Sequence, residues 1–100
     1  MNTIIHITTK AEWEAAVRKG YYDNLSLREE GFIHCSEERQ IPSVLDRYFQ
    51  DQKGLVKLVV ETEKLNSPYY YDWSNSAEDT FPHVYGPINI DAVTEILSVG

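Results

Sequence analysis

The first third of the chain alternates between a strand pattern and a helix pattern. Residues 2–8 carry β-branched and apolar side chains on both faces, which is typical of an interior strand. Thr9, followed three positions later by Glu12, forms a capping box that starts a helix, and Gly20 is placed to end that helix. The apolar positions that share one face of this helix are Trp13, Ala16 and Val17.

A second capping pattern follows, but few residues separate it from the next glycine. Ser26 and Glu29 have the capping-box spacing, but Gly31 comes so soon that at most one helical turn fits. Residues 32–36 then read as a short strand.

The middle of the chain predicts a second main helix and the central strand. Pro42 suits the first turn of a helix, and Gly54 ends that helix or the loop after it. The residues predicted to share the apolar face of this helix are Ile41, Val44, Leu45 and Tyr48. Residues 55–61 are apolar on both faces except at Lys57, so we expect a central strand.

In the last third of the chain, the apolar residues follow no clear helix or strand spacing until the final segment. Residues 63–80 are rich in Asn, Ser, Asp and Tyr and are interpreted as a long irregular loop, of which 66–80 is expected to be mobile. Turn formers bound residues 81–87, and residues 94–99 alternate as a final strand. The mixture of helices and strands predicts an α+β class, as one domain over residues 1–100.

Composition and charge narrow the function. Hydrophobic residues make up 42% and charged residues 25%, as in soluble globular domains. Nine Lys and Arg against sixteen Asp and Glu give a net charge of −7, and the basic residues are scattered, which disfavours nucleic-acid binding. No apolar run exceeds three residues, so we expect neither a membrane span nor a signal peptide, and a cytoplasmic location. The one cysteine, Cys35, excludes an internal disulfide.

All three histidines fall in or beside strand-like segments. His6, His34 and His83 would suit proton transfer or recognition of a polar ligand if they met in space. The alternative is that each makes a hydrogen bond within the core. We expect His6 and His34 to lie on neighbouring strands and to face one cleft, because each is on the less apolar side of its segment.

Metal and nucleophile chemistry are less favoured. His34 and Cys35 point to opposite faces of a strand, and neither Cys-x-x-Cys nor His-Glu-x-x-His spacing occurs, although a three-histidine site stays open. By the same parity, Cys35 is predicted to be a buried, inert thiol. Ser36 lacks the Gly-x-Ser-x-Gly elbow of an esterase and is interpreted as a hydrogen-bonding group.

Tyrosine supplies seven of the twelve aromatic residues. Alternation places Tyr85 with His83 and Phe81 on one face, so Tyr85 and His83 are predicted to form a rigid wall of the cleft, fixed by the neighbouring prolines. Tyr69 to Tyr71 are interpreted as covering the long loop. Neither a Gly-x-Gly-x-x-Gly motif nor a P-loop occurs, which excludes conventional Rossmann or P-loop nucleotide binding.

Three stretches together carry a family resemblance. They are Ile-His-Ile-Thr at 5–8, Gly-Phe-Ile-His-Cys-Ser at 31–36 after Ser26-Leu27, and Phe-Pro-His-Val-Tyr-Gly-Pro at 81–87. In combination they resemble domain-of-unknown-function family 952, across nearly the whole chain.

The resemblance implies a fold related to the ADP-ribosyltransferases, with a split mixed or antiparallel sheet, two main helices and a cleft for NAD. By that resemblance His6 would contact a ribose, and Tyr85 or Tyr21 would stack on nicotinamide. The family's glutamate before the Phe-Pro-His stretch corresponds to Asp72 here. The residues predicted to bind the ligand are His6, Ser26, His34, Ser36, His83 and Tyr85.

Two functions follow as alternatives. One is an enzyme that processes NAD or a related nucleotide, or transfers ADP-ribose from it. The other is a small-molecule-binding module that keeps the pocket but lacks the catalytic glutamate. No catalytic residue is assigned. A pocket in which the three histidines meet an acidic side chain would favour the enzyme.

Overall fold

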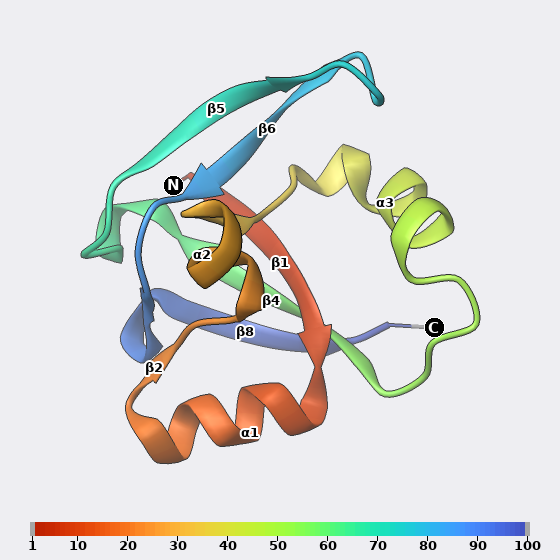
Figure 1. Ribbon diagram of the computed structural model, residues 1–100. Helices are drawn as coiled ribbons and strands as arrows, with labels where there is room; N and C mark the ends of the chain where they lie inside the picture. The colour runs from red at the N-terminus through yellow and green to blue at the C-terminus, as the bar shows by residue number, and fades with distance from the viewer. Residues whose placement is uncertain (1, 100) are drawn as a thin grey trace.

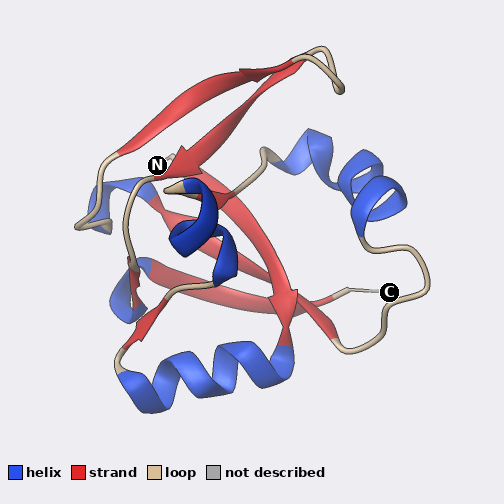
Figure 2. Cartoon of the chain, viewed as in Figure 1, coloured by secondary structure: helices blue, strands red, loops and turns tan. Residues whose placement is uncertain are grey.

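The computed structural model describes residues 2–99 as a small α+β domain (Figures 1 and 2). Its strands are β1 (Thr3–Thr9), β2 (Tyr21–Tyr22), β3 (Ile33–His34), β4 (Leu55–Glu61), β5 (Tyr69–Ser74), β6 (Asp79–Val84), β7 (Ile88–Asn89) and β8 (Val93–Ser98). Its α-helices are α1 (Lys10–Lys19), α2 (Leu25–Glu30) and α3 (Ile41–Tyr48). Short 3-10 turns are η1 (Glu38–Gln40), η2 (Thr62–Lys64) and η3 (Ile90–Ala92).

The largest buried sheet has the order β1-β4-β8, with antiparallel pairing throughout. Strand β4 lies between its two neighbours and is buried along most of its length, which confirms residues 55–61 as the central strand. Apolar side chains on both faces of β4 are needed because separate groups of core residues pack on its two sides.

Two smaller antiparallel sheets complete the described chain: β2 with β7, and β3-β6-β5. The β3–β6 pair places His34 directly opposite His83. Beyond β3, Ile5 and Ser36 form an isolated bridge, with backbone N–H to O distances of 2.8 and 2.7 Å, which ties β1 to this sheet. The expected split sheet is therefore present, and all its described pairings are antiparallel rather than mixed.

Helix α1 begins and ends where the sequence predicts. The Thr9 side chain accepts the backbone N–H of Glu12, and Gly20 adopts a left-handed conformation with φ of 99° that glycine tolerates best. Trp13 and Ala16 are buried, so this helix packs its apolar face on the core.

Helix α2 differs from the prediction. Its N-cap is Asn24, whose side chain accepts the N–H of Leu27, and not Ser26. The Ser26 hydroxyl instead donates to the carbonyl of Phe32 at 2.6 Å, so it holds the chain that enters β3. Starting two residues earlier gives the helix the six residues that a cap at Ser26 does not allow.

Helix α3 follows the short turn η1, with Pro42 in its first turn. Ile41 and Val44 are buried as predicted, but Tyr48 is 59% exposed. Leu45 and the C-cap Phe49 also pack against the core, so Tyr48 alone of the predicted apolar face is exposed.

The interpretation of residues 63–80 as irregular is wrong. Strands β5 and β6 form an antiparallel hairpin, in which Tyr69 pairs with Val84 and Ser74 with Asp79 (Figure 1). The prediction for residues 32–36 was too long, because only Ile33 and His34 are strand.

The core gathers on both sides of the β1-β4-β8 sheet. On one side it includes Ile4, Leu58 and Val60, packed with Trp13 of α1 and residues from the smaller sheets. Within residues 2–99, no helix is both long enough and apolar enough to cross a membrane.

Candidate functional site

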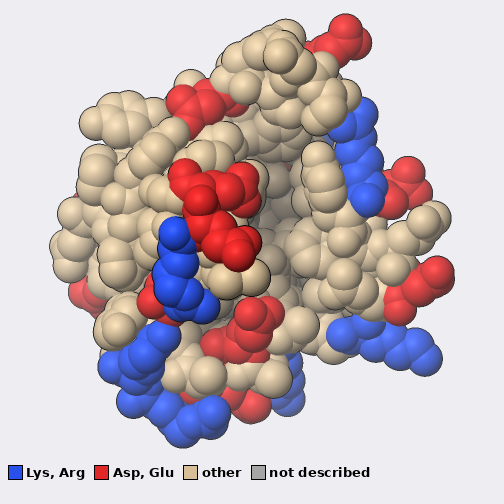
Figure 3. Space-filling model, viewed as in Figure 1, with Lys and Arg blue, Asp and Glu red and all other residues tan. Residues whose placement is uncertain are grey.

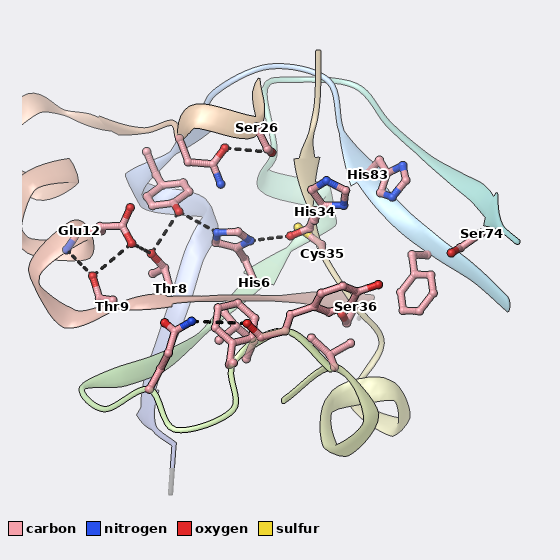
Figure 4. A pocket seen from close by; sticks show the side chains of 18 of the residues that line it. His6, Thr8, Thr9, Glu12, Ser26, His34, Cys35, Ser36, Ser74 and His83 are labelled. Atoms are coloured by element: carbon pink, nitrogen blue, oxygen red, sulfur yellow. Dashed lines mark hydrogen bonds between the residues drawn. The ribbon is translucent and has the colours of Figure 1, made fainter. Parts of the chain in front are cut away.

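A pocket of about 540 Å³ lies where the three sheets approach one another (Figure 4). This volume is in the range of small-molecule sites. Its polar lining residues, besides the three histidines and Tyr22, include Thr8, Glu12, Asn24, Ser26, Ser36 and Gln52. Its apolar and aromatic lining residues include Val44, Tyr48, Phe49, Trp73 and Phe81. Polar lining groups come mainly from β1 and α2, and most of the aromatic rings come from the α3 region and the β5–β6 hairpin, which also contributes Ser74 and His83.

Five of the six predicted site residues reach this pocket. His6, Ser26, His34, Ser36 and His83 all line it, so the structure brings the three histidines together. Their role in ligand binding stays a prediction.

Tyr85 does not line the pocket, which corrects its placement on the pocket wall. It follows the end of β6, where its hydroxyl donates to the carboxylate of Asp72 and its ring contacts Phe32. Alternation is right about the face on which Tyr85 lies, but it does not tell how far the pocket extends.

His6 is buried and has partners on both ring nitrogens. Its Nδ1 donates to the backbone carbonyl of His34 at 2.6 Å, and its Nε2 lies 2.7 Å from the Tyr22 hydroxyl. Since the carbonyl can only accept, the proton is on Nδ1, and the bare Nε2 accepts from Tyr22. Burial lowers the pKa of His6 to about 4, so the ring is neutral near pH 7.

A row of polar groups leads from His6 to the pocket carboxylate. Because the Tyr22 hydroxyl donates its one proton to His6 and the Thr8 hydroxyl donates its one proton to Glu12, the contact between Tyr22 and Thr8 is a close approach of two oxygens. The Tyr22 hydroxyl lies 3.2 Å from Thr8 Oγ1, and the Thr8 hydroxyl donates to Glu12 Oε1 at 3.0 Å (Figure 4). The Thr9 hydroxyl also donates to Glu12 Oε1. Burial raises the pKa of Tyr22 to about 12, so its phenol keeps its proton. Glu12 is thus oriented by two hydroxyls at one oxygen.

His83 is fixed by a carboxylate on the neighbouring strand. Its Nδ1 donates to Asp72 at 2.8 Å, and Phe32 stacks on its ring at 4.1 Å between centroids. Desolvation lowers the pKa of His83, and the hydrogen bond to Asp72 opposes that change. The hydrogen bonds from Tyr85 and His83 lower the pKa of Asp72, so Asp72 is ionised near pH 7. With Nδ1 engaged, Nε2 of His83 is the nitrogen left for a ligand.

His34 stands beside His83 with a carboxylate of its own. Its Nε2 lies 3.2 Å from Glu30 of α2, and both side chains are about half exposed. Figure 4 shows His34 and His83 projecting from adjacent strands toward the same region. The pair offers proton donors and acceptors to a bound molecule.

Cys35 is 3% exposed, which confirms it as a buried thiol. Burial raises its pKa, so the thiol is protonated at neutral pH and is a poor nucleophile. Within the described part of the chain, no three His, Cys, Asp or Glu side chains are grouped to hold a metal ion, so the three-histidine metal site is not formed there.

Several further pocket residues were not predicted as site residues, among them Glu12, Tyr22 and Trp73. Glu12 was interpreted only as part of a helix cap, and Tyr22 was not among the predicted ligand-binding residues. Trp73 lies in the stretch assigned to a loop. The cap at Thr9 does hold a signal for Glu12, because a carboxylate at the start of α1 must lie close to the end of β1.

Fold and site together define a small α+β protein with a polar and aromatic pocket at the junction of three antiparallel sheets. The chain belongs to the family described as "Protein of unknown function (DUF952)", whose model matches residues 7–96.

Protein CC0527 from Caulobacter crescentus is similar in structure across the whole domain. Its crystal structure matches with a TM-score of 0.89 and 31% identity, covering 99% of this chain and 87% of that chain. A crystal structure of a double mutant of CC0527 gives 0.88 and 30%, with the same coverage. The solution structure of CC0527 gives 0.83 and 32%, covering 99% of this chain and 85% of that chain. The comparison with curated proteins finds no match.

Proposed function

We propose that the pocket binds NAD or a related nucleotide. The observation that carries this proposal is that aromatic rings and many hydrogen-bonding groups line the same pocket. A nucleoside needs the same combination, because a planar base can stack on rings while its ribose hydroxyls need polar partners. The resemblance to the ADP-ribosyltransferase fold, which the family motifs suggest, supports the same ligand class.

The proposed roles of the histidines follow from their free ring nitrogens. His6 has both nitrogens occupied, so it holds the Tyr22 hydroxyl and the His34 backbone in place rather than contacting the ligand first. His83 has Nε2 to offer, and His34 and Ser36 lie on the same wall. These three are the direct ribose partners in our proposal.

A transfer reaction would need a carboxylate near the glycosidic bond. Cleavage of that bond builds positive charge on the ribose, which a fixed negative group stabilises. Glu12 lines the pocket and is held in orientation by Thr8 and Thr9, so it is our candidate for this role. Asp72 is less suited, because it does not line the pocket and instead stands behind His83.

The alternative is a binding module without catalysis. It is favoured by the same contacts of Glu12, since hydroxyl donors already satisfy one of its oxygens. Both functions share the pocket and differ in whether the glycosidic bond breaks.

The test is a titration with NAD and ADP-ribose, followed by two-dimensional NMR and by Trp73 fluorescence. Trp73 lines the pocket, whereas Trp13 is buried in the core, so a Trp73→Phe variant identifies the responding ring. We expect saturable shifts at pocket residues, and loss of the fluorescence response in Trp73→Phe. Binding of neither compound would overturn the proposal. Release of nicotinamide from bound NAD, lost in Glu12→Gln, would establish the enzyme rather than the module.

A further inference from the structure

The pocket has an unusual charge inventory. Among residues 2–99, its lining includes the carboxylate of Glu12 and no Lys or Arg. Two more carboxylates, Glu30 and Asp72, stand directly behind the lining histidines His34 and His83. Three negative groups therefore face or adjoin the pocket without a permanent positive charge among them.

Burial disfavours a positive charge on two of the three lining histidines. Burial keeps His6 neutral, because its pKa is lowered to about 4. Burial likewise lowers the pKa of His83. The third, His34, has the carboxylate of Glu30 3.2 Å from its Nε2, so a negative group stands beside this ring as well.

None of the nine Lys and Arg residues, all within the described chain, lines the pocket, and six of them have partners elsewhere in the fold. Those within ion-pair distance of a carboxylate are Lys19, Arg28, Arg39, Lys57 and Lys64. Arg47 donates to the carbonyl of Ser76 in the hairpin turn. Figure 3 shows a hollow on this face of the molecule, with acidic side chains gathered beside it where α2 lies in Figure 1. With a net charge of −7, the wider field adds to the local one.

The aromatic rings of the pocket lining fit the same ligand charge. Trp73 and Tyr48 line the pocket and are 61% and 59% exposed, so their rings are accessible to a bound group. The face of an indole or a phenol ring attracts a cation through its quadrupole. A planar cation could stack on such a ring while its charge is directed to Glu12.

We propose that the pocket selects a planar organic cation, of the amidinium or pyridinium class, over neutral and anionic molecules of equal shape. This preference rests on the proposed function, because it concerns the same pocket and specifies the charge of the group that binds there. For a nucleotide ligand, it places the positively charged ring inside the pocket and the phosphates outside it.

Three nearly isosteric compounds test the charge preference directly: benzamidine is a cation, benzamide is neutral and benzoate is an anion. Each is titrated at pH 8 against the full chain, and dissociation constants are measured from NMR shifts of pocket residues. We expect benzamidine to bind about tenfold more tightly than benzamide, and benzoate to bind most weakly. Equal affinities, tighter binding of benzoate, or no binding of any of the three would overturn the proposal.

A pair of charge-removing variants separates Glu12 from the general field. Glu12→Gln should remove most of the preference for benzamidine over benzamide. Glu14→Gln removes the same charge from the same helix outside the pocket lining, and should leave the preference nearly unchanged. Equal effects of the two variants would show that net charge alone attracts the cation and would overturn the pocket selection.

The two proposals can fail separately. Tight binding of ADP-ribose without any preference for benzamidine would overturn the charge selection and leave nucleotide binding standing. A clear preference for benzamidine with no binding of NAD or ADP-ribose would do the reverse.

Discussion

His34 and His83 lie opposite each other on β3 and β6, with ring centroids 5.2 Å apart in an edge-to-face arrangement. Each ring has a carboxylate at one nitrogen: Glu30 for His34 and Asp72 for His83. Desolvation lowers the pKa of His83, the hydrogen bond to Asp72 raises it, and the neighbouring His34 lowers it further. The protonation of His83 therefore depends on both neighbours.

Asp72→Asn should lower the pKa of His83 further, because it removes the negative charge at Nδ1. The same change should lower the pKa of Tyr85, which the hydrogen bond to Asp72 raises. NMR titration of the His83 ring protons measures the first effect. Asp79→Asn is the matched control, since Asp79 lies on the same hairpin but bonds Arg39 and Gln40. An unchanged His83 pKa in Asp72→Asn would show that the carboxylate does not act on the ring.

His83→Ala should weaken ligand binding more than it lowers stability. Loss of the ring removes the proposed contact through Nε2, and the partners left behind, Asp72 and Phe32, lie near the surface. Thermal unfolding with and without NAD separates the two effects. A large fall in melting temperature with unchanged affinity would mean that His83 only connects the hairpin to the rest of the fold.

His6 should make the protein less stable in acid. Its pKa is about 4 in the folded chain and 6.5 as a free side chain, so the unfolded state binds the proton more readily between these values. The stabilisation is complete above pH 6.5 and is lost as the pH falls toward 4, to a total on the order of 3 kcal/mol. Urea unfolding of the native chain and of His6→Gln across this range isolates the contribution. Identical pH profiles would contradict the buried, neutral ring.

Tyr22→Phe should lower the free energy of unfolding by about 1 to 3 kcal/mol, because it leaves the buried Nε2 of His6 without a donor. Tyr21→Phe provides the control, since Tyr21 is the exposed neighbour on the same short strand. Chemical denaturation of both variants gives the comparison. Equal stabilities would mean that the phenol contributes little to the His6 environment.

Cys35 should react slowly with a thiol reagent in the folded state and rapidly in denaturant. The thiol is 3% exposed and its pKa is raised by burial, so both access and thiolate formation are limited. The chain has one cysteine, so the absorbance of the thiolate released from an aromatic disulfide reagent measures the reaction of Cys35 alone. Fast labelling without loss of the fold would contradict the burial.

The sequence predicts elements whose signals are local. Thr9 and Gly20 bound α1 through cap chemistry, and the apolar run at 55–61 places β4 in the centre. The β5 strand could not be predicted in this way, because Tyr70, Tyr71 and Trp73 remain exposed and the strand pairs along only one edge. Its pairing with β6 is a tertiary contact, and the sequence of β5 carries no alternation of buried and exposed residues that would signal it.

From spacing alone, the site residues were predictable only on strands, where successive side chains point to opposite faces. The alternation at His34 and Cys35 correctly separates a half-exposed imidazole from a buried thiol, although both residues contribute to the pocket lining. Tyr22 joins the site through a hydrogen bond to His6 on a different sheet, and no spacing rule describes that contact, whereas Glu12 bonds the nearby Thr8 and is indicated by the helix cap. The N-cap of α2 was likewise not predictable from spacing. The Ser26 hydroxyl bonds the carbonyl of Phe32, and Asn24 caps the helix instead.

One imidazole connects three separate hydrogen-bonded sheets. His6 is part of β1, its Nε2 partner Tyr22 belongs to β2, and its Nδ1 partner is the His34 carbonyl of β3. Local opening of any one sheet must therefore break at least one hydrogen bond of His6. Amide protons around Tyr22 and His34 should then exchange with solvent at similar rates, as parts of a single cooperative unit, and His6→Gln should separate their exchange rates.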